Sequence, residues 1–375
     1  MEQCLCSVIK ANRNIDAEIF VVDNNSTDGS KDFFTNRFPQ VKFIWKIKNE
    51  GFAKANNEAL QIATGEKIVF LNPDTIVPED CFEKCISFFS TTKNIGILGV
   101  RMIDGSGNYL PESKRGFPSS FTSFFKITGL TKLFPHSKLL ANYYLGHLPE
   151  KEINEVDVLP GAFMMADKKT LDKTGGFDEI FFMYGEDIDL SYRIQKAGFK
   201  NYYFPQITII HFKGESTQKK SIQYIRNFYG AMLLFVKKHY RNLPGNLYAA
   251  LINVAIVIKT VLSSIQNGFK KPAVAAGKKI YGNKVVVISD AAAFQKIQQS
   301  IQQYFIQVER ADDLNLAHEN DAVVLCEPNM SFSEMIKIME LHQKKYKFFI
   351  CAEGANSIVG SNDKTATGNS IEMEY

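Results

Sequence analysis

The sequence has few cysteines and lacks any arrangement of them that is typical of a metal site or a redox pair. Its six cysteines occur in no CxxC motif and at no Cys/His metal-ligand spacing: Cys4, Cys6, Cys81, Cys85, Cys326 and Cys351. Such cysteines are typical of free thiols in a reducing compartment. The first residues also lack the pattern of a signal peptide, so we expect the protein to stay on the cytoplasmic side of the membrane.

Acidic residues are nearly missing from one long stretch. Residues 201–282 contain twelve Lys or Arg and a single acid, Glu215, which gives a net charge of +11. The whole chain carries +4, so the remaining residues carry 4 − 11 = −7. A basic block in an otherwise acidic protein favours an anionic partner. Because no nucleic-acid motif or aromatic stacking platform is evident, we expect an anionic membrane and no nucleic acid.

Part of this basic block is predicted to form a two-faced helix at residues 247–269. One face is polar: Asn253, Lys259, Thr260, Ser263, Ser264, Gln266 and Asn267. A spanning helix does not need such a face, and a lysine near its centre costs about 3 kcal/mol. We therefore predict a helix in the plane of the membrane, flanked by Arg241, Lys270 and Lys271. Packing against the preceding domain is the alternative.

The amino-terminal part alternates apolar runs with helical patterns. Strands are expected at residues 17–23, 41–46 and 67–71, with helices between them. This alternation predicts a parallel sheet with right-handed crossovers, in which residues 67–71 form a central strand. Asp23 and Asp74 each follow a strand, so both are expected at the sheet edge where such folds bind ligands.

Asp74 has two interpretations from its surroundings alone. Its carboxylate, with Asn72 two residues before it, can reach a hard divalent cation that phosphate oxygens also hold. Alternatively, it caps the turn that follows, because such turns are common beside proline.

Five motifs occur in a fixed order along the chain. They are residues 19–30 (IFVVDNNSTDGS), 49–57 (NEGFAKANN), 71–74 (LNPD), 161–163 with 175–179 (GAF and GGFDE), and 185–193 (GEDIDLSYR). Together they resemble family 2 glycosyltransferases with the GT-A fold, and most of all the bacterial rhamnosyltransferase-like members. The resemblance implies an α/β fold with a mostly parallel sheet flanked by helices.

The resemblance also implies which residues bind the donor. Asp23 is similar to the acid that accepts the imide N–H of a pyrimidine base. Asp28 is similar to the second acid of that loop, although an Asx turn or a helix N-cap would also explain it. The other residues implied in substrate binding are Asn25, Asn49, Gly51, Lys54, Asn57, Asn72, Gly161 and Ala162.

The metal and the catalytic base are implied in the same way. Residues 72–74 stand where many relatives have Asp-x-Asp, so Asp74 is the expected ligand of Mn²⁺ or Mg²⁺, and His211 is expected to complete the site. Asp187 resembles the general base of inverting members, with Glu186 beside it. Stabilisation by the helix dipole is the alternative reason for acids at this helix start.

Further basic and polar residues are candidates for contacts with phosphate groups. Lys114 and Arg115 are expected either to face phosphates or to lie in solvent, with solvent favoured. Lys213, Ser216 and Thr217 are candidates for contacts with the diphosphate.

The function implied is that of an inverting, metal-dependent glycosyltransferase. It would move a sugar, with rhamnose as one candidate, from a UDP- or dTDP-linked donor to a glycan or glycolipid acceptor. The place would be the cytoplasmic face of a bacterial cell membrane, in cell-surface polysaccharide synthesis. The alternative is an inactive relative that binds nucleotide sugar or membrane as a regulatory or scaffolding part.

Three parts are expected along the chain. Residues 1–240 would form the GT-A domain, 241–277 the membrane helix and a linker, and 278–375 a small Rossmann-like α/β domain with a polar, partly irregular tail from Ser357. That last part has no GxGxxG after its first strand, so a dinucleotide site is not expected. Family members open with a strand before the first helix, and the chain begins at what resembles that helix. We therefore expect a strand to be missing beside residues 17–23.

Overall fold

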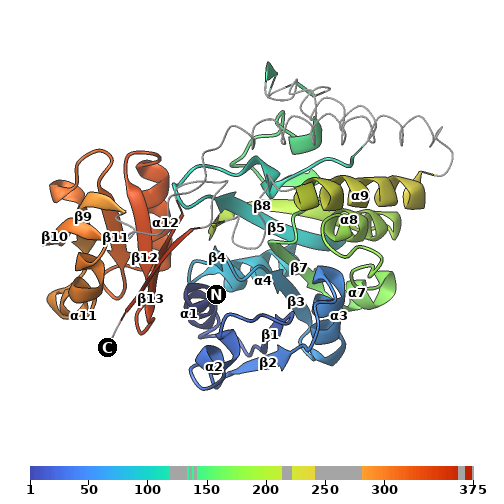
Figure 1. The fold of residues 1–375 in the computed structure, drawn as a ribbon. Helices are drawn as coiled ribbons and strands as arrows, with labels where there is room; N and C mark the ends of the chain where they lie inside the picture. Colours follow the sequence, from blue (N-terminus) through green and yellow to red (C-terminus); the bar gives the residue numbers. More distant parts are fainter. Residues whose placement is uncertain are drawn as a thin grey trace.

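The computed structural model describes residues 1–118, 133–134, 137–138, 142–212, 222–240, 281–361 and 368–373. Helices pack on two six-stranded sheets and on one two-stranded sheet in these residues. Figure 1 shows the carboxy-terminal sheet, in orange and red, beside the amino-terminal sheets. The α/β class predicted from the sequence is confirmed.

The first two strands form a small sheet of their own. Strand β1 (Ile19–Asp23) pairs in parallel with β2 (Val41–Trp45), and α2 (Ser30–Thr35) connects them. Within the described residues, β1 pairs with no other strand. The prediction that Asp23 and Asp74 follow strands of one sheet is therefore wrong.

The large amino-terminal sheet has the order β3-β7-β5-β8-β4, and β6 pairs with β8. Its strands are β3 (Lys67–Leu71), β4 (Thr75–Ile76), β5 (Ile95–Ile103), β6 (Asn154–Val156), β7 (Phe163–Asp167) and β8 (Lys200–His211). The prediction that β3 is a central parallel strand is wrong, because β3 is an edge strand antiparallel to β7. Burial alternates along β3, which is typical of a strand with one buried face.

The apolar residues 156–165 predict a single strand at the far side of the sheet, and this prediction is also wrong. Residues 157–162 separate β6 from β7, because Pro160 and Gly161 interrupt the extended run. Strand β7 then lies inside the sheet, between β3 and β5, rather than at its far side.

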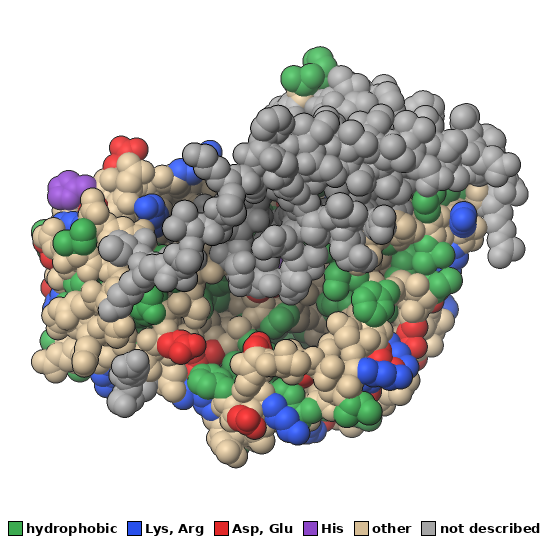
Figure 2. All heavy atoms as spheres, in the orientation of Figure 1, with side chains coloured by type: hydrophobic (Ala, Val, Ile, Leu, Met, Phe, Trp, Pro, Cys, Tyr) green, Lys and Arg blue, Asp and Glu red, His purple; other side chains and the backbone are tan. Residues whose placement is uncertain are grey.

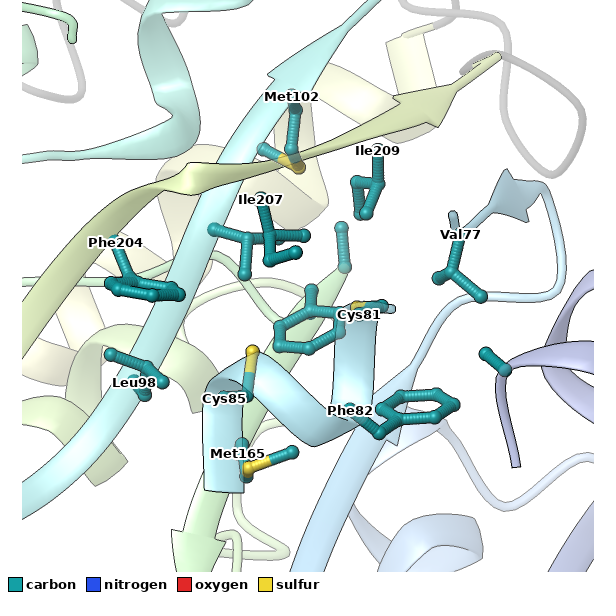
Figure 3. Packing of buried hydrophobic residues seen from close by; sticks show 14 of the residues in the cluster. Val77, Cys81, Phe82, Cys85, Leu98, Met102, Met165, Phe204, Ile207 and Ile209 are labelled. Atoms are coloured by element: carbon teal, nitrogen blue, oxygen red, sulfur yellow. The ribbon is translucent and has the colours of Figure 1, made fainter. Parts of the chain in front are cut away.

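Helices α1 (Glu2–Ala11), α3 (Phe52–Ile62), α4 (Cys81–Thr91), α7 (Lys168–Thr174) and α8 (Glu186–Lys196) pack around these strands. In Figure 3, Cys81, Phe82 and Cys85 of α4 face apolar side chains from β5, β7 and β8. Burial of such side chains stabilises the fold by about 1.5 to 3 kcal/mol each. The six cysteines are all free thiols, as expected.

Residues 224–240, rich in Phe and Lys, predict a helix, and α9 (Ile222–His239) confirms it. It lies along α8 in Figure 1. The side chain of Asp189 in α8 is fully buried and contacts Arg193 Nε, Lys238 Nζ and His239 Nε2, each at 2.6 Å. Because three basic groups surround one buried carboxylate, this cluster fixes α9 to α8.

The carboxy-terminal sheet has the order β10-β9-β11-β12-β13-β14. Its strands are β9 (Gly282–Ile288), β10 (Phe305–Ala311), β11 (Ala322–Cys326), β12 (Lys347–Cys351), β13 (Ser357–Gly360) and β14 (Asn369–Glu372), with helices α11 (Ala291–Gln302) and α12 (Phe332–Leu341). The tail from Ser357 is predicted to be partly irregular, and its described part contains β13 and β14, which bury Ile358 and Ile371. Strand β10 was not predicted, because residues Gln307 and Glu309 weaken its apolar pattern.

The two six-stranded sheets belong to units in direct contact. Gln3 of α1 donates to Ser357 O at 2.6 Å and accepts from Ala352 N at 2.8 Å. The carboxylate of Glu79 accepts from the N–H groups of Phe332 and Ser333 at 2.7 and 3.1 Å, so an acid of one unit binds the first turn of α12 in the other. Burial of these polar groups makes the contact specific.

Several predicted features lie outside the described residues. These are the membrane helix at 247–269 with Arg241, Lys270 and Lys271, and the candidate phosphate contacts Lys213, Ser216 and Thr217. Where the structure is described, none of its helices has the length and apolarity needed to cross a bilayer. On the face drawn in Figure 2, acidic and basic side chains of the described surface are interspersed.

Candidate active site

The proposed metal ligands lie together at one end of the large sheet. Thr75 of β4 pairs with His211 of β8, which places Asp74 beside His211. His211 Nε2 lies 3.3 Å from Asp74 Oδ1 and 3.5 Å from Asn72 Nδ2. The side chains of His211 and Asp74 are only 11% and 15% exposed. The three residues named from the sequence are thus brought together.

The charge state of this pair follows from its contacts. Burial alone would raise the pKa of the Asp74 carboxyl, but the charge and hydrogen bond of His211 outweigh burial and hold that pKa below its ordinary value of 3.8. His211 Nδ1 is buried and has no hydrogen-bond partner among the described residues. Asp74 is therefore ionised at neutral pH, as a metal ligand must be.

The donor atoms fit a divalent cation. Carboxylate and amide oxygens suit Mg²⁺ and Mn²⁺, and an imidazole nitrogen favours Mn²⁺. Neighbouring ligands about 2.1 Å from an octahedral ion lie about 3 Å apart, which is close to the 3.3 Å observed. In the described residues, no three His, Cys, Asp or Glu side chains form a metal cluster. Any ion held here would need further ligands from a bound molecule.

The candidate base Asp187 stands at the second position of α8. Tyr184 and Gly185 before it have φ values of 68° and 84°, which turn the chain sharply into the helix. Asp187 Oδ1 accepts from Ile188 N at 2.8 Å, and Oδ2 accepts from Gly161 N at 3.3 Å and from Arg115 Nη2. The side chain is 14% exposed, so its carboxylate is held firmly but remains within reach of solvent.

The prediction that Lys114 and Arg115 lie in solvent is wrong, because both side chains are buried, whereas their contact with phosphates stays a prediction. Lys114 Nζ donates to Leu145 O and Leu148 O at 2.8 and 2.9 Å, and burial lowers its pKa to about 8. Arg115 forms the ion pair with Asp187. Sequence reasoning missed this partner because residues 115 and 187 are far apart along the chain and no local pattern connects them.

The turn at residues 160–162 joins the base to the metal ligands. Gly161 N donates to Asp187, and one residue later Ala162 O accepts from Asn72 N at 3.1 Å. Asn72 in turn faces His211. Gly161 and Ala162, which were expected to bind substrate, therefore lie between the candidate base and the candidate metal ligands.

The expected donor loop is held by Asn24, which the sequence analysis did not single out. Asn24 Nδ2 donates to Gly51 O and Asn24 Oδ1 accepts from Glu50 N, both at 3.0 Å. Next to it, Asp23 Oδ2 accepts from Ser26 N at 2.8 Å, and Asn25 adopts a left-handed φ of 70°. The position of Asn24 in a loop of turn-forming residues was the only signal for its role.

The second donor loop touches the segment that precedes the base. Phe52 N donates to Phe182 O at 2.9 Å. Gly51 has φ +88°, and a Cβ there would lie 2.4 Å from Phe182 O, so no other residue fits. Asn49 Oδ1 accepts from Gly51 N at 3.0 Å and closes the turn. Through these contacts the loops after β1 and β2 meet the loop that leads into α8.

Three residues expected at the donor make contacts within the protein. Asp28 Oδ1 accepts from Ser30 N and Oγ at 3.1 and 2.6 Å, which agrees with the turn alternative. Lys54 pairs with Glu50 at 2.7 Å. Asn57 binds the backbone of Phe177 through both ends of its amide, at 2.8 and 2.9 Å. A contact of these side chains with a donor stays a prediction.

Glu186 differs from its neighbour Asp187 in protonation. Its side chain is buried, and its Oε2 has no hydrogen-bond partner among the described residues. Burial first, and then the charge of Asp187, raises the pKa of Glu186 to about 8. The helix-dipole interpretation of the acids at this helix start stays a prediction.

The stability of the protein is expected to fall as pH rises from about 4.5 to about 8, because only the unfolded chain loses the Glu186 proton readily in that interval. The loss reaches about 2 to 5 kcal/mol at high pH, from the shift of 4.5 to about 8. Glu186→Gln keeps the neutral shape and should remove this decline. Thermal unfolding at about pH 5 and about pH 9 measures it. Equal declines in both proteins would show that Glu186 is ionised in the native state.

Comparisons with known proteins indicate which family the chain resembles. Residues 1–146 match the family described as Glycosyl transferase family 2. The chain is 27% identical over 229 residues to the N-acetylglucosaminyl-diphospho-decaprenol L-rhamnosyltransferase of Mycobacterium tuberculosis (strain ATCC 25618 / H37Rv), which covers 58% of this chain and 74% of that protein. It is 29% identical over 174 residues to the rhamnosyltransferase WbbL of Escherichia coli (strain K12), which covers 43% of this chain and 61% of WbbL.

Among solved structures, one match is the mannosyltransferase PcManGT of Pyrobaculum calidifontis in complex with GDP-Man and Mn²⁺. It is 15% identical, with a TM-score of 0.45, and 72% of each chain is covered. The family match and the two curated relatives confirm the resemblance drawn from the motifs. Over residues 1–146 the chain matches glycosyltransferase family 2, and it is similar to bacterial rhamnosyltransferases.

Proposed function

We propose that the protein transfers a sugar, with inversion, from a nucleoside-diphosphate donor to a hydroxyl group of the acceptor. One observation carries the proposal: the turn at 160–162 contacts the candidate base at 3.3 Å on one side and the candidate metal-binding segment at 3.1 Å on the other. A displacement at an anomeric carbon needs a base on one face and stabilisation of the leaving group on the other. This geometry supports both roles.

Asp74 and His211 are the residues that would hold a divalent cation, Mn²⁺ or Mg²⁺, with Asn72 beside them. When bound, the cation would neutralise negative charge on the leaving diphosphate. The protein's own part is to keep Asp74 ionised and to hold the His211 ring beside it, and their contact at 3.3 Å does both.

Asp187 would take the proton of the acceptor hydroxyl. The acceptor oxygen forms a bond to the anomeric carbon as the bond from that carbon to the diphosphate oxygen breaks, and the proton moves to the carboxylate. The nucleoside diphosphate leaves with the electron pair. Because the acceptor attacks the face opposite the leaving group, the configuration inverts.

The names of the curated relatives suggest which substrates to test. The names of the two curated relatives state rhamnose transfer, and one names a decaprenol diphosphate carrier. We propose a dTDP- or UDP-linked donor, with rhamnose as the first sugar to test, and a glycan or lipid-linked acceptor. The basic excess in residues 201–282 supports work at the cytoplasmic face of an anionic membrane, on cell-surface polysaccharide.

Titration with UDP- and dTDP-sugars, with and without Mn²⁺, tests the proposal. We expect metal-dependent binding of at least one donor and slow donor hydrolysis or transfer. An inactive relative acting as a scaffold would bind without turnover. Absence of metal-dependent binding for every donor would contradict the enzyme assignment for this chain.

A further inference from the structure

We propose that Arg115 is a positioning residue that orients Asp187 and selects which carboxylate oxygen receives the proton. This inference rests on the proposed function of Asp187 as the base. It adds a residue that neither the motifs nor the comparisons point to.

Backbone hydrogen bonds hold Arg115 in place independently of its side chain. Arg115 N donates to Val158 O at 3.0 Å, and Val158 N donates to Arg115 O at 2.9 Å, which forms an isolated antiparallel bridge. Its side chain then crosses to Leu159 O at 3.4 Å and to Asp187 Oδ2. Arg115 therefore ties the strand-like segment before residue 118 to the start of α8 through the turn that also carries Gly161.

The contacts of Asp187 are unequal on its two oxygens. A carboxylate offers about four lone-pair sites, two on each oxygen. Oδ2 uses both, for Arg115 Nη2 and Gly161 N, whereas Oδ1 uses one, for Ile188 N. The remaining site is on Oδ1. Oδ1 is thus the oxygen that can accept a proton from a substrate hydroxyl, and Arg115 keeps the carboxylate from rotating.

The charges around the pair support a functional role. The side chains of Arg115 and Asp187 are 10% and 14% exposed, so the charge of each is balanced by the charge of the other. Burial alone would lower the pKa of the guanidinium, but Asp187 and the Tyr143 hydroxyl raise it above its ordinary value, so Arg115 stays charged. Because Glu186 holds a proton at neutral pH, the pair faces no second negative charge from it.

The first test is chemical rescue of Arg115→Ala. We expect the kcat of sugar transfer to fall about 100-fold, which is the usual effect of a displaced catalytic group, while donor affinity is retained. Added guanidinium ion should restore part of the rate, and urea at the same concentration should not, because urea has the shape without the charge. Arg115→Lys, which keeps the charge, should fall between parent and Arg115→Ala. Parental kcat in Arg115→Ala would overturn the proposal.

A double variant separates an effect through Asp187 from a general loss of structure. If Arg115 acts through Asp187, adding Arg115→Ala to Asp187→Asn should lower the rate no further. A further loss equal to that of the single variant would overturn the proposal. If Asp187→Asn alone kept parental activity, both the proposed base and this inference would be overturned. If Asp187→Asn lost activity and the double variant lost more, only this inference would be overturned.

Arg101 supplies a matched control. It is another buried arginine, 6% exposed in its side chain, and pairs with Glu340 of α12. Arg101→Ala should lower the melting temperature about as much as Arg115→Ala, because each leaves a partly buried acid without its arginine partner, while kcat is retained and guanidinium has no effect. Equal losses of kcat in both variants would assign Arg115 a purely structural role.

Discussion

Replacing Asp187 with asparagine is expected to reduce sugar transfer about 10²- to 10⁴-fold, the usual cost of removing a general base. The amide keeps the size of the side chain and can still accept from Gly161 and Arg115, but it cannot take a proton. Donor affinity should hold, because the structure places Asp187 on the far side of the 160–162 turn from Asp74 and His211. Initial transfer rates and calorimetric donor binding measure the two quantities.

Glu186→Gln is the control for this experiment. Glu186 already carries a proton at neutral pH, so the amide replaces a neutral acid and the transfer rate should change little. Asp189 needs no such test, because its carboxylate is fully buried among Arg193, Lys238 and His239. Transfer by Asp187→Asn at near the parental rate would show that the base is not Asp187.

Features that depend on local sequence were predictable. The start of α8 follows from Gly185 and the acids after it, and the apolar run before His211 predicts the strand that carries it. Asn72, Asp74 and His211 were named from motifs far apart in the chain, and the structure places them together. The motifs could suggest that these residues lie together, because each motif stands at the end of a strand or the start of a helix.

Features that depend on pairing between distant segments were not predictable. The apolar run of β3 is compatible with a central or an edge strand, and only β7, almost a hundred residues later, decides which. Burial of Arg115 likewise depends on Asp187 from another element, and a basic residue before a proline-rich stretch looks solvated by itself. The protonation of Glu186 is a property of its packing and has no sequence signal.

Replacing Asp74 with alanine is expected to abolish metal-dependent donor binding. Loss of a residue that only supports a metal ligand costs about 10- to 100-fold in metal affinity, so loss of the ligand itself should cost more than about 100-fold. The fold should survive, because in the described part of the chain the Asp74 side chain forms its ion pair with His211, whereas its backbone carbonyl still accepts from Phe212 N. Calorimetric titration of the donor with and without Mn²⁺ measures the effect.

Two further variants show whether the effect of Asp74 comes from the metal. Asp80→Ala is the matched control, because Asp80 lies six residues later and pairs with Lys84 in a half-exposed ion pair, so donor binding should be unchanged. His211→Ala should weaken Mn²⁺ more than Mg²⁺, since imidazole nitrogen is the ligand that favours Mn²⁺. Since Asp74 and His211 contact each other, His211→Ala added to Asp74→Ala should cost little more. Unchanged donor affinity of Asp74→Ala, with or without Mn²⁺, would mean that the Asp74–His211 contact is an ordinary ion pair and that the diphosphate is neutralised elsewhere.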